Sequence, residues 1–257
     1  MNLTSILSSF LTPVRVITNF KDSPKILLRI AATPIHGSSR RYSNASSSDQ
    51  KIYELRQYTI ISKDARKAIQ AANENIHNRM KHSKCTGFWL SELGGLNEFI
   101  HIWEYESLAQ RATVRKNLSE DPGFIGMTEK LFPYFQSMTN AVTVPMSWFP
   151  TIKEVTTSTG IYSMESWVVA DSTHSYEGVE KYYKHVEANY DAQLVGALRT
   201  IFGPVVNSAI LLWKYNNLDT AAKIQCDSFK DSRLKVTTGE YKVSSKVLSS
   251  MPFSPLK

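Results

Sequence analysis

The sequence repeats itself at a fixed distance, and this repeat limits the possible folds most strongly. Residues 52–58 (IYELRQY) align with residues 161–167 (IYSMESW) at an offset of 109 positions, and residues 102–105 (IWEY) align with residues 212–215 (LWKY) at 110. The offset between the two segments changes by only one residue over half a domain, and this indicates a duplication. We therefore expect two similar halves of about 100 residues each, which is a normal domain size.

Each half shows the same order of elements. In the first half, alternating and β-branched segments predict strands, and apolar stripes behind capping residues predict helices. The expected strands are 51–61, 86–93, 98–105 and 141–147, and the expected helices are 63–82, capped by Ser62, then 107–118 and one starting at Asp121. In the second half, strands are expected at 160–169, 194–201, 208–215 and 241–248, with helices near 176–190 and 218–229. The second half therefore lacks one helix of the first.

This order, βαββαβ, is that of the ferredoxin-like motif. Such a unit has helices on one face of an antiparallel sheet, and its other face must be covered because an open apolar face aggregates. Two sheets can cover each other, so we expect an α+β fold of tandem ferredoxin-like repeats, of the dimeric α+β barrel type. The domains would span 51–150 and 158–257. The pairing could occur within one chain or between chains, and a homo-oligomer is expected.

The N-terminal segment differs in charge from the rest of the chain. Residues 1–48 hold six Lys or Arg residues and one acid, whereas the other 209 residues hold 24 basic and 22 acidic ones. A basic, Ser-rich leader almost free of acids is typical of a mitochondrial presequence, and a disordered arm is the alternative. The pattern Arg40-Arg41-Tyr42-Ser43 predicts cleavage after Tyr42. We expect a presequence over 1–42, a flexible linker over 43–50 and a location in the mitochondrial matrix.

Several function classes are disfavoured by the sequence. The nearly neutral body argues against binding of nucleic acid, although the whole chain carries a net charge of +7. The sequence contains no phosphate-binding glycine loop and no HExxH or CxxC metal motif. No apolar run is long enough to predict a transmembrane helix. We therefore predict no cofactor and no metal site.

Motifs in the first half resemble the NIPSNAP family. They are a helix end with R…HS, a hairpin with G-x-W…E-x-G, and a strand with H-x-W-x-Y. The matching residues are Arg79, His82, Ser83, Gly87, Phe88, Trp89, Glu92, Gly94, Asn97, His101, Trp103, Tyr105, Arg111 and Arg115. The resemblance covers 51–150 strongly and 158–257 weakly. It implies a dimeric α+β barrel and mitochondrial roles in quality control, including recruitment of autophagy receptors, or in vesicle trafficking, and it supplies no catalytic residues.

A strand face with His101, Trp103 and Tyr105 is the clearest candidate pocket, because alternation places all three on one side. Inside a barrel, such a histidine could act as a general base or haem ligand. The simpler interpretation is an aromatic core whose histidine makes one hydrogen bond. The second half has Leu211 where His101 stands, so chemistry that needs this histidine would be confined to the first half.

Two further features suggest contacts with partners. Arg111 and Arg115 lie one helical turn apart and could hold an anionic ligand or partner, or pair with local acids. Residues 105–108 (YESL) fit the aromatic-x-x-aliphatic pattern that autophagy modifiers bind, but the expected strand would hide Tyr105. Two function classes remain. The first is a non-enzymatic mitochondrial adaptor with autophagy-related or mitochondrial protein partners. The second is a monooxygenase-like or haem-binding barrel that uses the His101 face.

Overall fold

The structure is a computed structural model that describes residues 50–155, 160–169, 176–228, 230 and 240–257. The predicted presequence and all of the predicted linker except Gln50 lie outside the described residues. The chain divides into two units, residues 1–44 and 45–257, and only the second holds described residues.

The described elements follow the expected order along the chain. The strands are β1 (Ile52–Ile60), β2 (Lys84–Leu93), β3 (Glu98–Tyr105), β4 (Phe135–Pro145), β5 (Ile161–Val169), β6 (Ala192–Phe202), β7 (Ser208–Tyr215) and β8 (Glu240–Ser250). The helices are α1 (Ala65–Asn75), α2 (His77–Met80), α3 (Leu108–Glu120), α4 (Pro122–Leu131), α5 (Glu177–Asn189) and α6 (Leu218–Ser228). Short 3-10 turns, Ser62–Asp64 and Phe132–Tyr134, precede α1 and β4.

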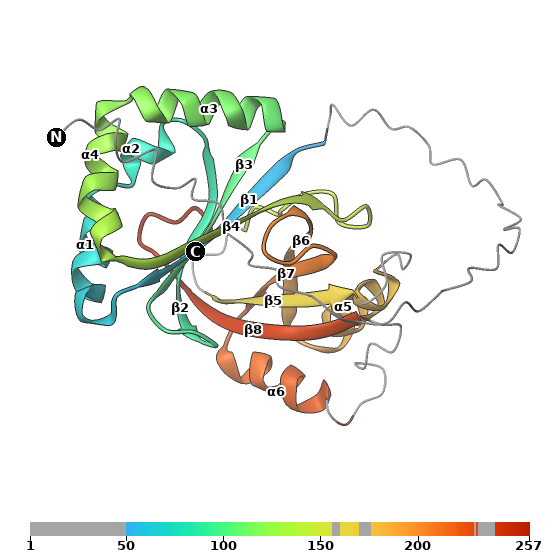
Figure 1. The fold of residues 1–257 in the computed structure, drawn as a ribbon. Helices are drawn as coiled ribbons and strands as arrows, with labels where there is room; N and C mark the ends of the chain where they lie inside the picture. Colours follow the sequence, from blue (N-terminus) through green and yellow to red (C-terminus); the bar gives the residue numbers. More distant parts are fainter. Residues whose placement is uncertain (1–49, 156–159, 170–175, 229, 231–239) are drawn as a thin grey trace, which may run out of the picture. The chain divides into compact units, whose positions relative to one another are not determined.

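The eight strands form one closed antiparallel barrel in the order β1-β3-β2-β8-β5-β7-β6-β4 (Figure 1). In the first half, β1 lies between β3 and β4, and β2 pairs with β3. In the second half, β5 lies between β7 and β8, and β6 pairs with β7. The halves join at two seams, β2 with β8 and β4 with β6. The predicted α+β barrel is confirmed, and it closes within a single chain.

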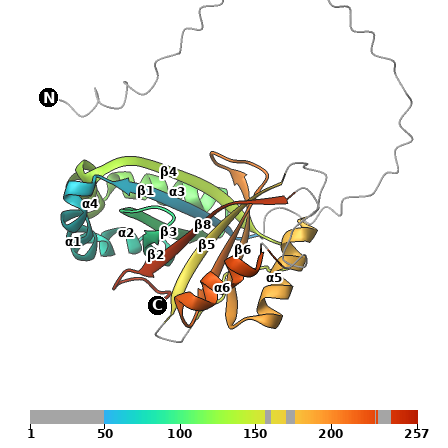
Figure 2. The ribbon, with the colours of Figure 1, turned by 90° about the horizontal axis from the view of Figure 1, so that it is seen from below.

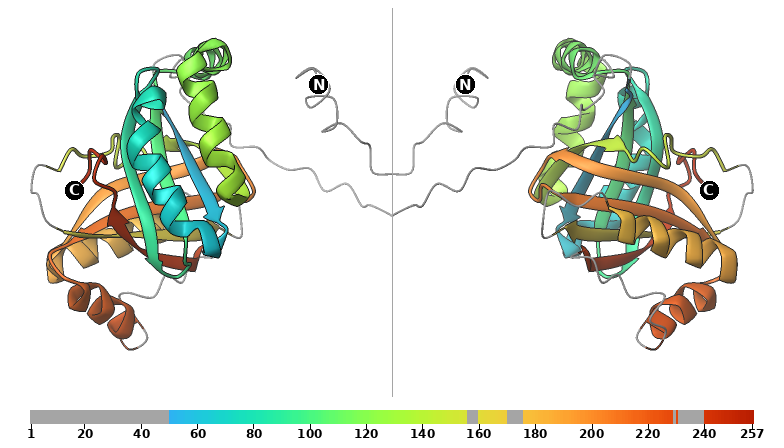
Figure 3. Two further views of the ribbon diagram at one scale, coloured as in Figure 1. Left: turned by 90° about the vertical axis from the view of Figure 1, so that its left-hand side faces the viewer. Right: turned by 90° about the vertical axis from the view of Figure 1, so that its right-hand side faces the viewer.

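The helices lie outside the barrel on two sides. In Figure 2, α1 to α4 lie beside β1 to β4, and α5 and α6 lie beside the strands of the second half. Figure 3 shows the same separation by colour, with cyan and green helices against the first half and gold and orange helices against the second. Two apolar cores fill the layers between strands and helices, and a third core, including Leu55, Ile100 and Leu212, fills the barrel.

Some predicted boundaries need correction. The helix expected over 63–82 is divided at Ile76 into α1 and α2, and Ser62 lies in the 3-10 turn without capping α1. Strand β4 begins at Phe135 rather than 141, because its first part pairs with β1 while its side chains stay largely exposed, and this leaves no burial pattern in the sequence. The caps Ser107 and Asp121 are confirmed, since their side chains accept hydrogen bonds from Gln110 N and Gly123 N.

Matching irregularities occur in the two central hairpins. A bulge lies between Cys85 and Gly87 in β2 and between Leu194 and Gly196 in β6, at the same offset of 109. Asn97 and Asn207 both adopt left-handed backbone, with φ of 56° and 57°, a conformation in which asparagine is enriched. These two aligned pairs therefore share backbone conformation as well as residue type.

The two bulge glycines are predicted to differ in how they tolerate alanine. A Cβ on Gly87 would lie 2.1 Å from Cη2 of Trp89, a fully buried indole that folds back over the glycine. A Cβ on Gly196 would lie 3.2 Å from Cγ1 of Ile152. We expect Gly87→Ala to lower the free energy of unfolding by about 2–3 kcal/mol through overpacking. Gly196→Ala should change the free energy of unfolding by less than about 1 kcal/mol. The lower conformational entropy of the unfolded chain offsets the mild clash in the folded protein.

Denaturant titration of both variants checks this prediction, and each serves as the control for the other. Equal losses in the two variants would contradict the assigned role of Trp89.

Candidate functional site

The predicted trio of His101, Trp103 and Tyr105 lies between the sheet and the helices. Trp103 and Tyr105 belong to the core that includes Val114 and Leu118 of α3, whereas Ile100 and Ile102 point into the barrel. This face is therefore covered by the helices and does not line the inside of the barrel. Their exposed fractions are only 4%, 1% and 1%, so the structure brings the three residues together as part of a packed layer.

His101 is held by its aromatic neighbours. Its Nδ1 accepts a hydrogen bond of 2.6 Å from the Trp103 indole, which can only donate. A neutral His101 therefore carries its proton on Nε2, which is buried and has no hydrogen-bond partner among the described residues. The ring stacks on Phe88 at 4.5 Å and meets Tyr58 edge-on at 4.9 Å. Burial, followed by the charges of Arg56 and Arg79, holds the pKa of His101 well below its usual value, so the imidazole stays neutral.

Arg79 of α2 fixes the other two members of the trio. Its guanidinium lies 4.0 Å from the Trp103 ring centroid, and its Nη2 donates to the Tyr105 hydroxyl at 2.7 Å. Its Nη1 donates to Ser83 Oγ at 2.7 Å. Arg79 is itself only 3% exposed. The arginine and serine of the R…HS motif thus anchor the end of the first helix to strand β3.

A buried carboxylate lies at the centre of this layer. Glu54 of β1 has no exposed surface. Its Oε1 lies 2.6 Å from Arg111 Nη2 and 3.2 Å from Arg56 Nε. Its Oε2 accepts from the Tyr105 hydroxyl at 3.2 Å. We call Glu54, Arg56, Arg79, Tyr105 and Arg111 the Glu54 cluster.

The electrostatics of the Glu54 cluster favour the ionised acid. Burial alone raises the pKa of Glu54, but the hydrogen bond from Arg111, the charge of Arg56 and a hydrogen bond from Asn140 lower it to about 2. Glu54 therefore stays charged throughout the physiological pH range. A charge-assisted network of this kind fixes the position of helix α3 relative to strand β1.

The two arginines predicted to contact an anion have separate roles. Arg111 reaches inward to Glu54 and forms part of the cluster. Arg115 is exposed, and burial of part of its guanidinium together with the charge of Arg56 lowers its pKa. The structure thus supports the simpler interpretation for Arg111, pairing with an acid, and leaves Arg115 at the surface of α3.

The second half contains a different buried carboxylate. Glu165 of β5 has no exposed surface and lies opposite Leu211, as Arg56 lies opposite His101 in the first half. Its oxygens accept hydrogen bonds from two indoles, a phenol, an amide and an ammonium group. The donors are Trp167 and Trp213 at 3.3 Å, Tyr182 at 3.1 Å, Gln225 at 3.0 Å and Lys242 at 2.6 Å. We call Glu165 and these five donors the Glu165 cluster.

The sequence analysis missed both glutamates as site residues. A signal for the first was present, because Glu54 and Arg56 interrupt an apolar strand face that also carries Ile52, Tyr58 and Ile60. Opposite charges two residues apart on one strand face indicate a buried ion pair when helices cover that face. The partner on α3 could not be found in this way, since Arg111 is 57 positions distant.

Three smaller findings concern the YESL pattern, metal ligands and membrane spans. Tyr105 of the YESL pattern is 1% exposed, so this aromatic side chain is not presented at the surface. Among the described residues, no group of three or more His, Cys, Asp or Glu side chains is arranged to hold a metal ion. Within the same residues, no helix is long and apolar enough to cross a membrane.

Comparisons with known proteins agree with the sequence motifs. The NIPSNAP family model matches residues 53–150. Human protein NipSnap homolog 3A is 28% identical, over 81% of this chain and 87% of that protein. Mouse protein NipSnap homolog 3B is 27% identical, over 91% of this chain and 95% of that protein.

A solved structure shares the fold at low sequence identity. A provisionally assigned monooxygenase from Fusobacterium nucleatum has a TM-score of 0.54 and covers 79% of this chain and 93% of its own. Its sequence is 9% identical, so the likeness concerns the fold alone. The matched domain contains the R…HS helix end, the Gly87 bulge and the His101 strand. The chain is thus similar to the NIPSNAP family, through the family model over residues 53–150 and through the NipSnap homologs over most of its length.

Proposed function

We propose that this protein is a non-enzymatic adaptor of the NIPSNAP type that acts in the mitochondrial matrix. One observation carries the proposal: the face expected to do chemistry is filled by the protein itself. The Trp103 indole occupies Nδ1 of His101, and Phe88 and Tyr58 pack against the ring. The neighbouring charges are paired with each other in the Glu54 cluster. This layer is suited to a rigid core that presents outer surfaces to protein partners.

The alternative, a haem-binding or monooxygenase-like enzyme, has less support. A ligand could reach His101 Nε2 only if Phe88, Tyr58 or the covering helices moved. The shared fold with a provisionally assigned monooxygenase is a weak argument for shared chemistry, because one fold supports many functions.

The mitochondrial roles in the proposal come from the resemblance to the NIPSNAP family and from the leader. We propose that the presequence over 1–42 directs import, and that the protein takes part in quality control or vesicle trafficking. Cytosolic autophagy receptors could meet it only when import fails, so recruitment would report a loss of membrane potential. We also propose that 51–150 and 158–257 are tandem ferredoxin-like units, which the strand order of each half supports. Self-association stays a prediction, and it would use surfaces outside the closed barrel.

The variant His101→Leu separates the two functions. It copies Leu211 of the second half, which is fully buried at the corresponding strand position. We expect a folded protein with the same partners and a change of about 1 kcal/mol in unfolding free energy at pH 7.5, because one indole hydrogen bond is lost. Proximity labelling in intact mitochondria measures the partners. The labelling enzyme should follow Lys257 through a flexible linker, since Leu256 is buried.

The pH dependence gives a second readout. Because the pKa of His101 is lowered on folding, its neutral form contributes stability above pH 6.5 that is lost as the pH falls below this value. At pH 5.5, the wild type should have lost about 1.4 kcal/mol more than His101→Leu.

In the proximity-labelling experiment, a fusion lacking residues 1–42 controls for labelling in the cytosol. A folded variant that loses a chromophore or a turnover present in the wild type would overturn the adaptor proposal.

A further inference from the structure

A cavity opens at one end of the barrel, on the face of the sheet opposite to the His101 layer. The other end is covered by the C-terminal residues, where the Tyr162 hydroxyl donates to Lys257 O and Leu256 joins the barrel core. Further along β5, Ser166 and Val168 line the open end, which we call the mouth pocket. Strand β5 thus runs from the covered end to the pocket.

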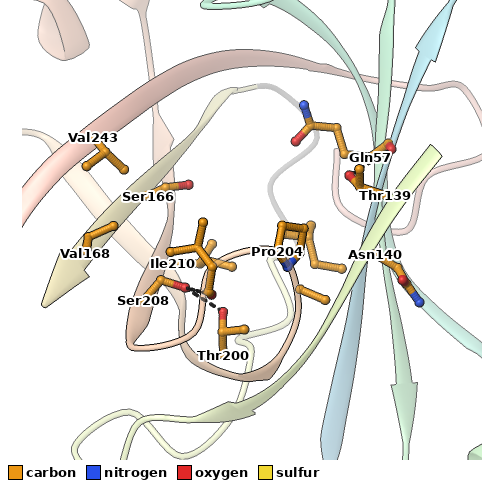
Figure 4. Close-up of a pocket in the computed structure, with 13 residues that line it drawn as sticks. Gln57, Thr139, Asn140, Ser166, Val168, Thr200, Pro204, Ser208, Ile210 and Val243 are labelled. Atoms are coloured by element: carbon orange, nitrogen blue, oxygen red, sulfur yellow. Dashed lines mark hydrogen bonds between the residues drawn. The ribbon is translucent and has the colours of Figure 1, made fainter. Parts of the chain in front are cut away.

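The mouth pocket has a volume of about 170 Å³. Figure 4 shows Val168, Ser166, Ile210 and Ser208 around one side, facing Gln57 and Thr139. The lining side chains come from both halves, so the pocket exists only because the barrel closes within one chain. For comparison, a dry apolar cavity of about 150 Å³ accommodates benzene. The mouth pocket therefore fits a molecule of about six to nine non-hydrogen atoms.

The lining defines the chemistry of an occupant. Leu55, Val168, Ile210 and Val243 provide apolar walls, and no lining residue is charged. An ion would lose its hydration there without gaining a counter-charge, which disfavours a carboxylate or an ammonium group. Ser166 makes no side-chain hydrogen bond within the described part of the chain, so its hydroxyl can pair with one polar group of an occupant. The lining thus favours an uncharged molecule that is mostly apolar and carries a single hydrogen-bonding group.

We propose that the mouth pocket binds a small neutral amphiphile, such as a cyclic or short-chain alcohol or ketone, with its apolar part against Leu55 and Ile210 and its polar group at Ser166. This binding site is independent of the adaptor role and lies on the other side of the sheet from His101. It requires no catalytic step.

Two adjacent valines give a matched test. Val205 lines the pocket and is 49% exposed, whereas Val206 does not line it and is 57% exposed. An indole at position 205 should fill the cavity, and one at position 206 should remain at the surface. Both side chains are about half exposed, so neither variant should prevent folding. Val243→Trp, at a second lining position that is 59% exposed, gives an independent blocking variant.

The probe is cyclohexanol, titrated into the full chain with ¹³C-labelled Ile, Leu and Val methyl groups. We expect saturable shifts of pocket methyl signals with a Kd on the order of 1 mM. Val205→Trp and Val243→Trp should weaken binding at least about tenfold, and Val206→Trp should change it less than about twofold. Methyl signals remote from the pocket report whether each variant is folded. Non-saturable shifts, binding unchanged in both blocking variants, or equally tight binding of cyclohexanecarboxylate would overturn the proposal.

Discussion

Replacing Glu54 with leucine is expected to lower the free energy of unfolding by about 3–5 kcal/mol. The substitution removes the carboxylate that pairs with Arg56 and Arg111, and it leaves two guanidinium groups at the sheet–helix interface without their counter-ion. Removing one partner of a buried ion pair costs more than the pair contributes, because the remaining charge stays desolvated. Chemical denaturation at pH 7.5 measures the loss.

The pKa of Glu54 provides an independent check of this magnitude. It is lowered from 4.5 to about 2 on folding, so the ionised group stabilises the protein fully above pH 4.5, and this contribution is lost as the pH falls from 4.5 to about 2. A shift of that size corresponds to about 3 kcal/mol. The wild type should therefore lose this stability across that pH window, whereas Glu54→Leu should not.

Glu104 of β3 offers a control carboxylate on the other face of the same sheet. It lies directly opposite Tyr53 on the neighbouring strand β3 and pairs with Lys51 and Lys84, whose side chains are 44% and 54% exposed. Ion pairs with such exposed partners contribute little, so Glu104→Gln should cost less than about 1 kcal/mol. If the two variants lost similar stability, the Glu54 cluster would not be the central support of the first half.

The second large effect is expected at Glu165. Its replacement by leucine removes the shared acceptor of Trp167, Trp213 and Tyr182 and the counter-charge of Lys242. Buried donors without acceptors cost about 1–3 kcal/mol each, and relaxation of Lys242 toward solvent limits the total. We therefore expect a loss of about 3–5 kcal/mol. Intrinsic fluorescence during unfolding is a suitable measurement, since two of the donors are indoles.

Glu180→Gln is the control within the second half. Glu180 pairs with Lys184 one helical turn away, and the lysine is 61% exposed. Such a pair contributes about 0.3–0.5 kcal/mol. A loss at Glu165 no larger than the loss at Glu180 would contradict the view that each half is organised around its own buried carboxylate.

The two carboxylates also show where the aligned halves differ. Glu54 aligns with Ser163, and Glu165 aligns with Arg56, so each acid stands where the other half has a different group. In the alignment, the two acids lie two residues apart on equivalent strands. They therefore share the same strand face. The common backbone is therefore held together by different polar networks in its two halves.

Much of the fold was predictable from the sequence because the required signals are local. Alternation, capping residues and turn residues identified the order of elements, the hairpin glycines and the caps Ser107 and Asp121. The repeat then indicated a barrel, since each sheet needs its second face covered. Local signals were weakest at the start of β4, where the side chains are largely exposed and leave no burial pattern in the sequence.

The sequence by itself determined that His101, Trp103 and Tyr105 share one face of a strand, but not which side of the sheet that face covers. Both faces of β3 are apolar, with Ile100 and Ile102 on the other side, so alternation cannot distinguish barrel interior from helix layer. The tertiary structure decided this by laying α3 over the His101 face, which also brought Arg111 to Glu54. It likewise closed the barrel within one chain and formed the mouth pocket from both halves. The physical reason is that contacts between residues far apart in sequence depend on how whole elements pack, which no local pattern records.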